Sequence, residues 1–519
     1  MAAEPVARVE QMTVDVMTAR QIADTILDGA TIAVTGSGGG LLEAEAIFEA
    51  LELRFKETGA PRNLTLIHAL GFGDRDCRGA NRFAHEGMVK RVIGGHWTWS
   101  KPMQALAAEN RIEAYSLPSG VISLLLRESG SGRPGLITKT GLGTFVDPVH
   151  AGGRVNAAAR EDIVERVEFD GETYLRFKPL RIDVAIVKGT FADTFGNLSM
   201  AEEPADLDAF AVALAGHNCG GKVYAQVRDR VEPGSISPRE VTIPGILIDA
   251  IVIDPDQDQT YHGTYNPALA GRVRSTRVPE QTDARAGPKR VLALRAAMEL
   301  KHGDCVNFGF GASAGVAEII AERGESDRYW MTIEQGIHGG AMLTGDMFGM
   351  AVNPSAIVSA GNQFDFYHGG GLDTAFLGIA EVDRTGNVNV SHMGGQLIGP
   401  GGFIDITQNA QKVVFCGQFD AKGSKIAVRD GGIEILRNGE IRKFVSDVAA
   451  ITFSSEQALA RGQEVLYVTE RAVFRLSPDG IELIEFAPGA DLQRDILDRM
   501  DFAPVVRDPK PMPEAVFRA

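Results

Sequence analysis

The sequence has no apolar run long enough to cross a membrane. Runs such as residues 121–126 are far shorter than the roughly 20 residues that a spanning helix needs. The N-terminal segment lacks the basic stretch followed by an apolar stretch that marks a secretory signal. Cysteine is scarce and forms no Cys-x-x-Cys pair, which argues against a disulfide framework or a zinc site. These absences predict a soluble, cytoplasmic protein with reduced cysteines at positions 77, 219, 305 and 416.

The chain also lacks an excess of basic residues. Its formal net charge is -16 and its pI is about 5.2, so nucleic acid and anionic membranes are not expected as main partners. A local basic pocket for an anionic ligand stays compatible with this charge. The 519 residues, 44% of them hydrophobic and 23% charged, predict an ordered globular protein with more than one domain.

Two segments of the first half of the sequence recur in the second half. Residues 29–40 resemble 303–315, and residues 183–199 resemble 377–390. The first pair has the pattern of a strand, a glycine turn and a helix, which is typical of α/β folds with mostly parallel sheets. We therefore predict two related open α/β lobes. Residues 1–254 and 290–519 form the lobes, and the polar, proline-containing residues 255–289 link them.

Glu334 stands out because it follows a predicted buried strand, residues 329–333, and directly precedes a glycine turn. The corresponding strand of the first half, residues 64–68, ends without a carboxylate and carries His68 instead. Ligands of doubly wound sheets bind beyond the carboxyl ends of strands. Most glutamates are simply exposed to solvent, but this difference between the halves favours a ligand site at Glu334.

The glycine loops allow a second hypothesis, a nucleotide-dependent oxidoreductase. Residues 36–40 and 309–315 are rich in glycine, and a glycine turn before a helix can bind an anion. Both loops miss the full Gly-x-Gly-x-x-Gly spacing, and no Gly-Lys-Ser/Thr follows either of them. The oxidoreductase hypothesis is therefore the weaker one.

A metal site and an oxyanion site are two further possibilities to consider. His338, His368 and His392 lack the spacing of zinc ligands, so no metal is predicted. Residues 399–406 contain a glycine turn, which is either a tight bend or a source of backbone N–H donors for an oxyanion.

Six segments together resemble the family I coenzyme A transferases, specifically the fused-chain group that acts on acetate and other short-chain acids. The resemblance covers nearly the whole chain. The matching segments are residues 36–43, 84–97, 141–148, 363–371, 399–406 and 469–474.

The resemblance implies that Glu334 is a covalent nucleophile. It would form a glutamyl-CoA thioester while CoA is exchanged between two acids in a ping-pong reaction. The implied setting is short-chain fatty acid or ketone body metabolism. CoA is a substrate, and no metal or redox cofactor is implied. Relatives are homo-oligomers, so a tetramer or dimer is expected. The alternative is a CoA-thioester-binding protein without turnover. The implied oxyanion donors are Gly401 and Gly402, and the implied substrate-binding residues are Gly36, Gly38, Ser119, Gly120, Gly309, Gly311 and Gln363.

The sequence departs from the family pattern at three positions, Ser119, Gln335 and His338. Many relatives carry glutamine at the position of Ser119, and serine is shorter with a single donor. We therefore expect a roomier acyl pocket. On this interpretation, Ser119→Gln lowers the use of longer acyl-CoAs more than the use of acetyl-CoA.

Overall fold

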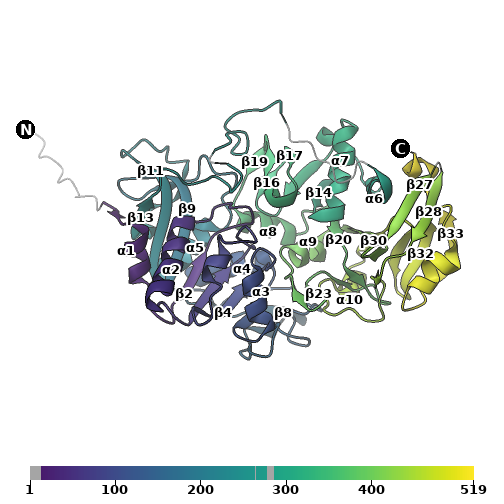
Figure 1. Cartoon of the computed structure of the whole chain (residues 1–519), viewed down its shortest axis with the longest axis horizontal. Coiled ribbons are helices and arrows are strands. Elements are labelled where there is room, and N and C mark those ends of the chain that lie inside the picture. The colour runs from purple at the N-terminus through teal and green to yellow at the C-terminus, as the bar shows by residue number, and fades with distance from the viewer. Residues whose placement is uncertain (1–12, 264, 278–285, 430, 519) are drawn as a thin grey trace, which may run out of the picture.

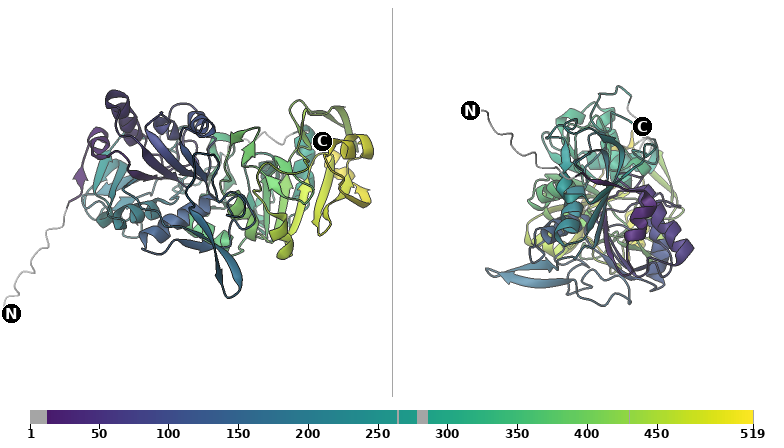
Figure 2. Two further views of the ribbon diagram at one scale, coloured as in Figure 1. Left: turned by 90° about the horizontal axis from the view of Figure 1, so that it is seen from below. Right: turned by 90° about the vertical axis from the view of Figure 1, so that its left-hand side faces the viewer.

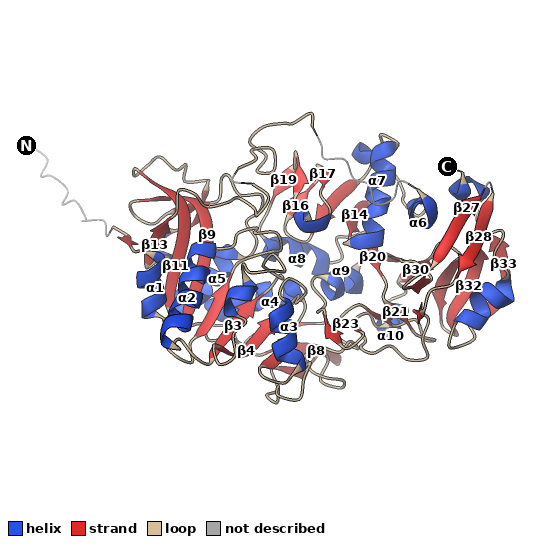
Figure 3. Ribbon diagram, viewed as in Figure 1, coloured by secondary structure: helices blue, strands red, loops and turns tan. Residues whose placement is uncertain are grey.

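The protein consists of two lobes, each built around a ten-stranded sheet (Figure 1). The computed structural model describes residues 13–263, 265–277, 286–429 and 431–518. The first sheet is made from residues before 254 and the second from residues after 304. Helices cover the sheets on both faces (Figure 3). The predicted α/β fold with two lobes of mostly parallel sheets is confirmed.

The main path of the first sheet is parallel throughout. Its strand order is β1 (Asp15–Val16), β13 (Ala250–Ile253), β11 (Lys222–Val231), β9 (Val184–Asp193), β2 (Thr31–Val34), β3 (Leu64–His68), β4 (Val89–Gly94) and β5 (Glu113–Ser116). The short strands β10 (Leu198–Ser199) and β12 (Val241–Ile243) pair beside this path and antiparallel to each other.

Two separate hydrophobic cores lie on the two faces of the first sheet. Helices α1 (Ala19–Thr25), α2 (Glu45–Thr58) and α3 (Lys101–Ala108) pack into one core, and α4 (Ser119–Gly130) and α5 (Ala209–Asn218) into the other. A three-stranded sheet of β6 (Leu136–Thr138), β8 (Glu172–Phe177) and β7 (Val164–Phe169) projects from this lobe (Figure 2).

The second sheet is parallel in its centre and antiparallel on both sides of that centre, and its last pair at the C-terminal edge is parallel again. A short connection, such as the turn after Ile333, can join only antiparallel neighbours, because parallel neighbours need a longer crossover. The strand order is β19 (Ala356–Ile357), β16 (Ile337–His338), β15 (Trp330–Ile333), β14 (Cys305–Phe308), β20 (Thr374–Gly378), β25 (Lys412–Cys416), β30 (Glu464–Val468), β31 (Ala472–Ser477), β32 (Gly480–Phe486) and β33 (Val505–Pro511). The helices are α6 (Gly287–Ala297), α7 (Ala314–Glu322), α8 (Ala360–His368), α9 (Phe403–Asn409) and α10 (Ser455–Ala460).

The strand orders of the two lobes correspond to each other. The run β13-β11-β9-β2-β3 has its counterpart in β30-β25-β20-β14-β15. The same side-chain turn also occurs in both lobes: Asp193 Oδ1 accepts the Asn197 N–H at 2.9 Å, and Asp383 Oδ1 accepts the Asn387 N–H at 3.1 Å. In each case a glycine precedes the asparagine, as the sequence repeat predicts. The repeat therefore reflects structural duplication.

The predicted division into residues 1–254, 255–289 and 290–519 stays a prediction. The described residues between 254 and 286 form no regular helix or strand, and α6 already begins at Gly287. Residues 278–285 of the predicted linker lie outside the described residues. None of the helices in the described part of the chain has both the length and the apolar character needed to span a bilayer.

Candidate active site

Glu334 lies in the turn between β15 and β16. The Gly336 N–H donates to the Ile333 carbonyl at 3.0 Å and closes the turn. Gly336 has a φ of +98°, and a Cβ there would lie 1.9 Å from the Val358 carbonyl oxygen. This glycine is therefore required by the turn itself. The turn leaves Glu334 at the carboxyl end of β15.

The Glu334 carboxylate is half-buried and rests against Gly402. Burial, and after it the negative charge of Asp405, raises the pKa of Glu334 to about 7, while the Gly402 N–H donates to the carboxylate and opposes this shift. A Cβ on Gly402 would lie 1.7 Å from Glu334 Oε2. The absence of a side chain at position 402 is therefore what lets the carboxylate reach the backbone.

The amide of Gly401 contacts a different group from the amide of Gly402. Its N–H donates to the Gly95 carbonyl of the first lobe at 2.9 Å. That amide is already engaged and does not donate to Glu334. The prediction that both glycine amides are free oxyanion donors is thus corrected for Gly401, and Gly402 remains the candidate.

Asp405 links the two lobes beneath this loop. It lies in α9 with no exposed surface, and its carboxylate accepts the Gly120 N–H at 3.0 Å. His368 Nε2 lies 2.8 Å from the other carboxylate oxygen. A second contact between the lobes, the ion pair of Arg127 with Asp365, is 2.8 Å long. The loop that contacts Glu334 is therefore held from both lobes.

Ser119 and Gly120 belong to this junction and do not line the cavity at Glu334. Ser119 is fully buried, its Oγ donates to the Ala69 carbonyl at 2.7 Å, and its N–H donates to the Gly401 carbonyl at 2.8 Å. A Cβ on Gly95 would lie 2.5 Å from Ser119 Oγ, so the space around the hydroxyl is filled. The expectation that Ser119 widens the acyl pocket is corrected.

We now expect Ser119→Gln to lower stability instead of changing substrate preference. A longer side chain at this filled position costs about 1–3 kcal/mol of unfolding free energy. Thermal denaturation should show the loss, while the ratio of acetyl-CoA to butyryl-CoA turnover stays that of the parent. Ser119→Ala, which only removes the bond to Ala69, is the matched control. A changed ratio at parental stability would contradict this prediction.

A cavity of about 370 Å³ lies in front of Glu334 and takes its walls from both lobes. Its surface is mainly apolar, with Leu70 from the first lobe and Leu377, Ile398 and Phe403 from the second. The predicted site residues that line it are Gly38, Gly309, Glu334, Gly401 and Gly402.

The other predicted residues lie elsewhere. A Cβ on Gly36 would meet Phe72 at 2.9 Å, so this glycine serves packing within the first lobe. Gly311 is exposed at the start of a 3-10 turn. Gln363 is buried on α8 beside His338. These positions, like Ser119 and Gly120, are not on the cavity wall.

Polar residues that we did not predict as site residues also face the cavity. Asn307 Oδ1 and Gln335 Oε1 are buried there and accept no hydrogen bond from the described residues. His96 also lines the wall, and burial lowers its pKa to about 4, so its imidazole is neutral near pH 7. All three had a signal in the sequence. Asn307 interrupts an apolar strand, His96 follows the end of β4, and Gln335, next to Glu334, departs from the family pattern.

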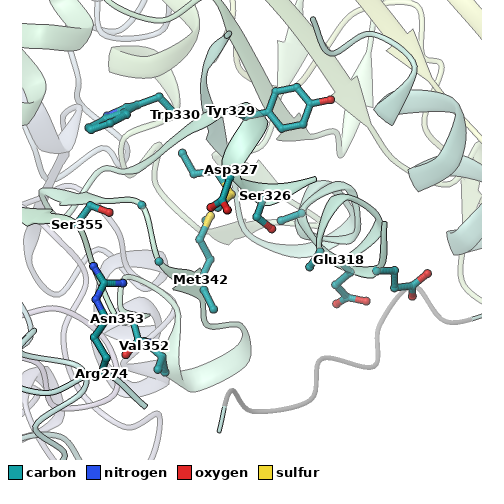
Figure 4. Close-up of a pocket in the computed structure, with 17 residues that line it drawn as sticks. Arg274, Glu318, Ser326, Asp327, Tyr329, Trp330, Met342, Val352, Asn353 and Ser355 are labelled. Carbon is teal, nitrogen blue, oxygen red and sulfur yellow. The ribbon is translucent and has the colours of Figure 1, made fainter. Parts of the chain in front are cut away.

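A larger cavity of about 540 Å³ lies behind the Glu334 turn (Figure 4). Figure 4 shows Met342 near its middle, with Arg274 on one side and Glu318 on the other. Gly339 and Gly340 line this cavity, whereas Glu334 does not. Its walls carry several carboxylates and lack the contact with Gly402, so we assign the candidate active site to the smaller cavity.

One group of possible metal ligands occurs among the described residues. Ligand atoms of Asp74, Asp76 and Cys77 lie within 4.8 Å of one another, outside the Glu334 cavity. Asp74 Oδ1 already accepts the backbone N–H groups of Asp76 and Cys77, both at 2.9 Å. The group is therefore explained as a side-chain turn.

Comparison with known proteins adds independent evidence. A family model described as coenzyme A transferase matches residues 16–254. The acetate CoA-transferase YdiF of Escherichia coli (strain K12) is 42% identical over 97% of this chain and 95% of its own. The caffeate CoA-transferase of Acetobacterium woodii is also 42% identical, over 96% of this chain and 97% of its own.

Solved structures of the YdiF enzyme from E. coli O157:H7 have the same fold. The apoenzyme matches with a TM-score of 0.93 and 41% identity, covering 99% of this chain and 98% of the other. A form described as a thioester complex with CoA has the same TM-score and identity, covering 98% and 96%.

Proposed function

Since the chain belongs to the coenzyme A transferase family and is an acyl-CoA transferase, we propose that Glu334 carries CoA between two carboxylic acids as a glutamyl-CoA thioester. The observation that carries this proposal is the half-buried Glu334 carboxylate, which faces a cavity shared by both lobes. The thioester complex described for the E. coli relative supports it.

The exchange needs only a carboxylate and a thiolate. Glu334 attacks the thioester carbonyl of the donor, the C–S bond breaks, and an acyl-glutamyl anhydride and the CoA thiolate result. The thiolate then attacks the glutamyl carbonyl, which releases the donor acid as a carboxylate and leaves the glutamyl-CoA thioester. The acceptor carboxylate reverses both steps. No water is consumed, and no proton is gained or lost overall.

The cavity supports these steps in two ways. Each step passes through a tetrahedral oxyanion, and a single fixed donor to such an oxyanion is worth about 2.7–4 kcal/mol. The Gly402 amide, next to the Glu334 carboxylate, is the proposed donor. The apolar wall limits water, which would otherwise hydrolyse the anhydride and the thioester.

The proposed substrates are acyl-CoAs and carboxylates of short chain length, acetate among them, in short-chain fatty acid or ketone body metabolism. The name of the YdiF relative supports acetate, and the name of the A. woodii relative indicates that an aromatic acid is also worth testing. Exchange assays with butyryl-CoA as donor, against acids of two to six carbons and caffeate, test this proposal. Binding of CoA thioesters without exchange to any acid would favour the alternative, a binding protein without turnover.

We expect kcat/KM for the acyl-CoA donor to rise with pH through an apparent pKa near 7. The nucleophile is the ionised carboxylate, and burial raises the pKa of Glu334 to about 7. Because the folded protein favours the protonated form, stability should fall as pH rises from about 4.5 to about 7. A pH–rate profile checks the rise of kcat/KM, and melting curves over the same pH range check the fall of stability. A flat profile would contradict the assignment, and Glu334→Gln should remove this contribution to the pH dependence of stability.

The proposal includes a homo-oligomer, more specifically a tetramer or dimer, located in the cytoplasm, with no nucleic-acid or membrane partner. The acidic net charge supports the absence of a nucleic-acid or membrane partner, and the four free cysteines support a location in the cytoplasm. Light scattering measures the oligomer directly.

A further inference from the structure

Arg75 is the only lysine or arginine among the described residues that line the Glu334 cavity. It belongs to the loop after β3, and its guanidinium carbon lies 3.9 Å from the centroid of the Trp99 ring. The backbone N–H of Arg75 donates to the Trp99 carbonyl at 3.0 Å. Its φ of +66° lies in the left-handed region, which a residue with a side chain rarely adopts. Such strain is often found at functional positions.

The partner of Arg75 comes from the other lobe. Arg75 forms an ion pair with Asp346, in the 3-10 turn Gly345–Met347. Phe348, two residues later, lines the cavity and meets Phe310 edge-on, with ring centroids 5.6 Å apart. The ion pair therefore joins the two lobes at the cavity wall.

The ion pair is open to solvent, whereas the neighbours of Glu334 are buried. The side chains of Arg75 and Asp346 are 37% and 49% exposed, while Asn307 and Gln335 are at most 3% exposed. An exposed ion pair contributes little to stability, so an anion that binds the guanidinium more tightly can displace Asp346. A phosphate accepts two hydrogen bonds from one guanidinium and is such an anion.

We propose that Arg75 binds a phosphate group of CoA, which takes the place of Asp346. This inference rests on the proposed function, since CoA must enter the cavity with its sulfur at Glu334. The phosphates lie at the other end of the CoA molecule and therefore point to the exposed part of the wall. The carboxylate of the acid substrate reacts at Glu334 itself, so it is not the anion that Arg75 binds.

Arg75→Met tests the proposal with little disturbance of the backbone. Both side chains are unbranched at Cβ, so the variant keeps the strain at this position and loses the charge, its hydrogen bonds and the contact of the guanidinium with the Trp99 ring. We expect the Kd for CoA, measured by calorimetry, to rise roughly 10- to 100-fold. Pantetheine, which has no phosphate, should bind the variant and the parent equally. Comparison of CoA with dephospho-CoA identifies whether the 3′-phosphate or the diphosphate is bound.

Asp346→Asn should act in the opposite direction. It removes the carboxylate that competes with phosphate for Arg75, so the Kd for CoA should fall while binding of pantetheine stays unchanged.

Arg78→Met is the matched control. Arg78 lies in the same loop, with its guanidinium carbon 4.7 Å from the Tyr261 ring centroid, pairs with Asp258 at 3.4 Å and is 40% exposed. It does not line the Glu334 cavity. Parental binding of CoA is expected for this variant.

Two results would overturn the assignment of Arg75: parental CoA binding by Arg75→Met, or equal losses for CoA and pantetheine. Both are measured without turnover. If Arg75→Met weakens CoA binding in a protein that exchanges no acid, the proposed function fails and the assignment of Arg75 stands. If exchange occurs but Arg75→Met binds CoA normally, the proposed function stands and the assignment of Arg75 fails.

Discussion

Glu334→Ala is expected to abolish CoA exchange, with a loss on the order of 10⁴-fold or more, as for the removal of a covalent nucleophile. The reason is that no other carboxylate lines the described wall of the cavity. Incubation of the parent protein with an acyl-CoA and no acceptor acid should add the mass of CoA less water to the peptide that contains Glu334. The alanine variant should show neither the adduct nor turnover, as measured by mass spectrometry and a steady-state assay.

The control for this variant is Glu322→Ala. Glu322 is a carboxylate on the wall of the larger cavity, so the same substitution there should leave the adduct and turnover intact. Binding of CoA by Glu334→Ala, measured by calorimetry, verifies that the cavity is still formed. Turnover near the parental level in Glu334→Ala would show that another group is the nucleophile.

Gly402→Ala is expected to lower kcat about 10²- to 10³-fold, the loss measured when a single oxyanion donor is removed. An added Cβ would lie 1.7 Å from Glu334 Oε2, so either the carboxylate or the loop must move. The φ of Gly402 is −85°, which alanine adopts readily, so backbone strain is not the cause. Steady-state kinetics with a saturating acyl-CoA measures the effect.

Gly378→Ala is the matched control because Gly378 lines the same cavity. A Cβ there would have its nearest contact at 3.8 Å, from the Phe310 carbonyl. We expect parental kcat for this variant. An equal loss in both variants would mean that the cavity tolerates no added methyl group. That result would contradict a specific role for Gly402. Melting curves of both variants test whether they are folded.

The fold was predictable because its evidence is local in the sequence. Strand, glycine turn and helix follow one another in both halves, and the repeated aspartate and asparagine turns at Asp193 and Asp383 stand at matching places. Glu334 was predictable for the same reason: it directly follows a strand whose counterpart in the first half carries no carboxylate.

Contacts between the lobes were not predictable in this way. Ser119 follows a strand end, a position typical of ligand residues, yet its hydroxyl donates to Ala69 and its N–H to Gly401. The amide of Gly401 was expected to be free, but the Gly95 carbonyl of the other lobe accepts it. Which amides and side chains stay available to a ligand depends on how the two lobes meet, and no pattern within one segment contains that information.

Because the cavity takes its walls from both lobes of one continuous chain, their meeting is an intramolecular event. Joining two units in one chain gives each a high effective concentration at the other, set by the length of the connection. Formation of the cavity within one chain should therefore not depend on dilution. If the chain were cut between the lobes, the pieces would follow mass action, and activity would fall with dilution to a degree set by the contacts around Gly401 and Asp405.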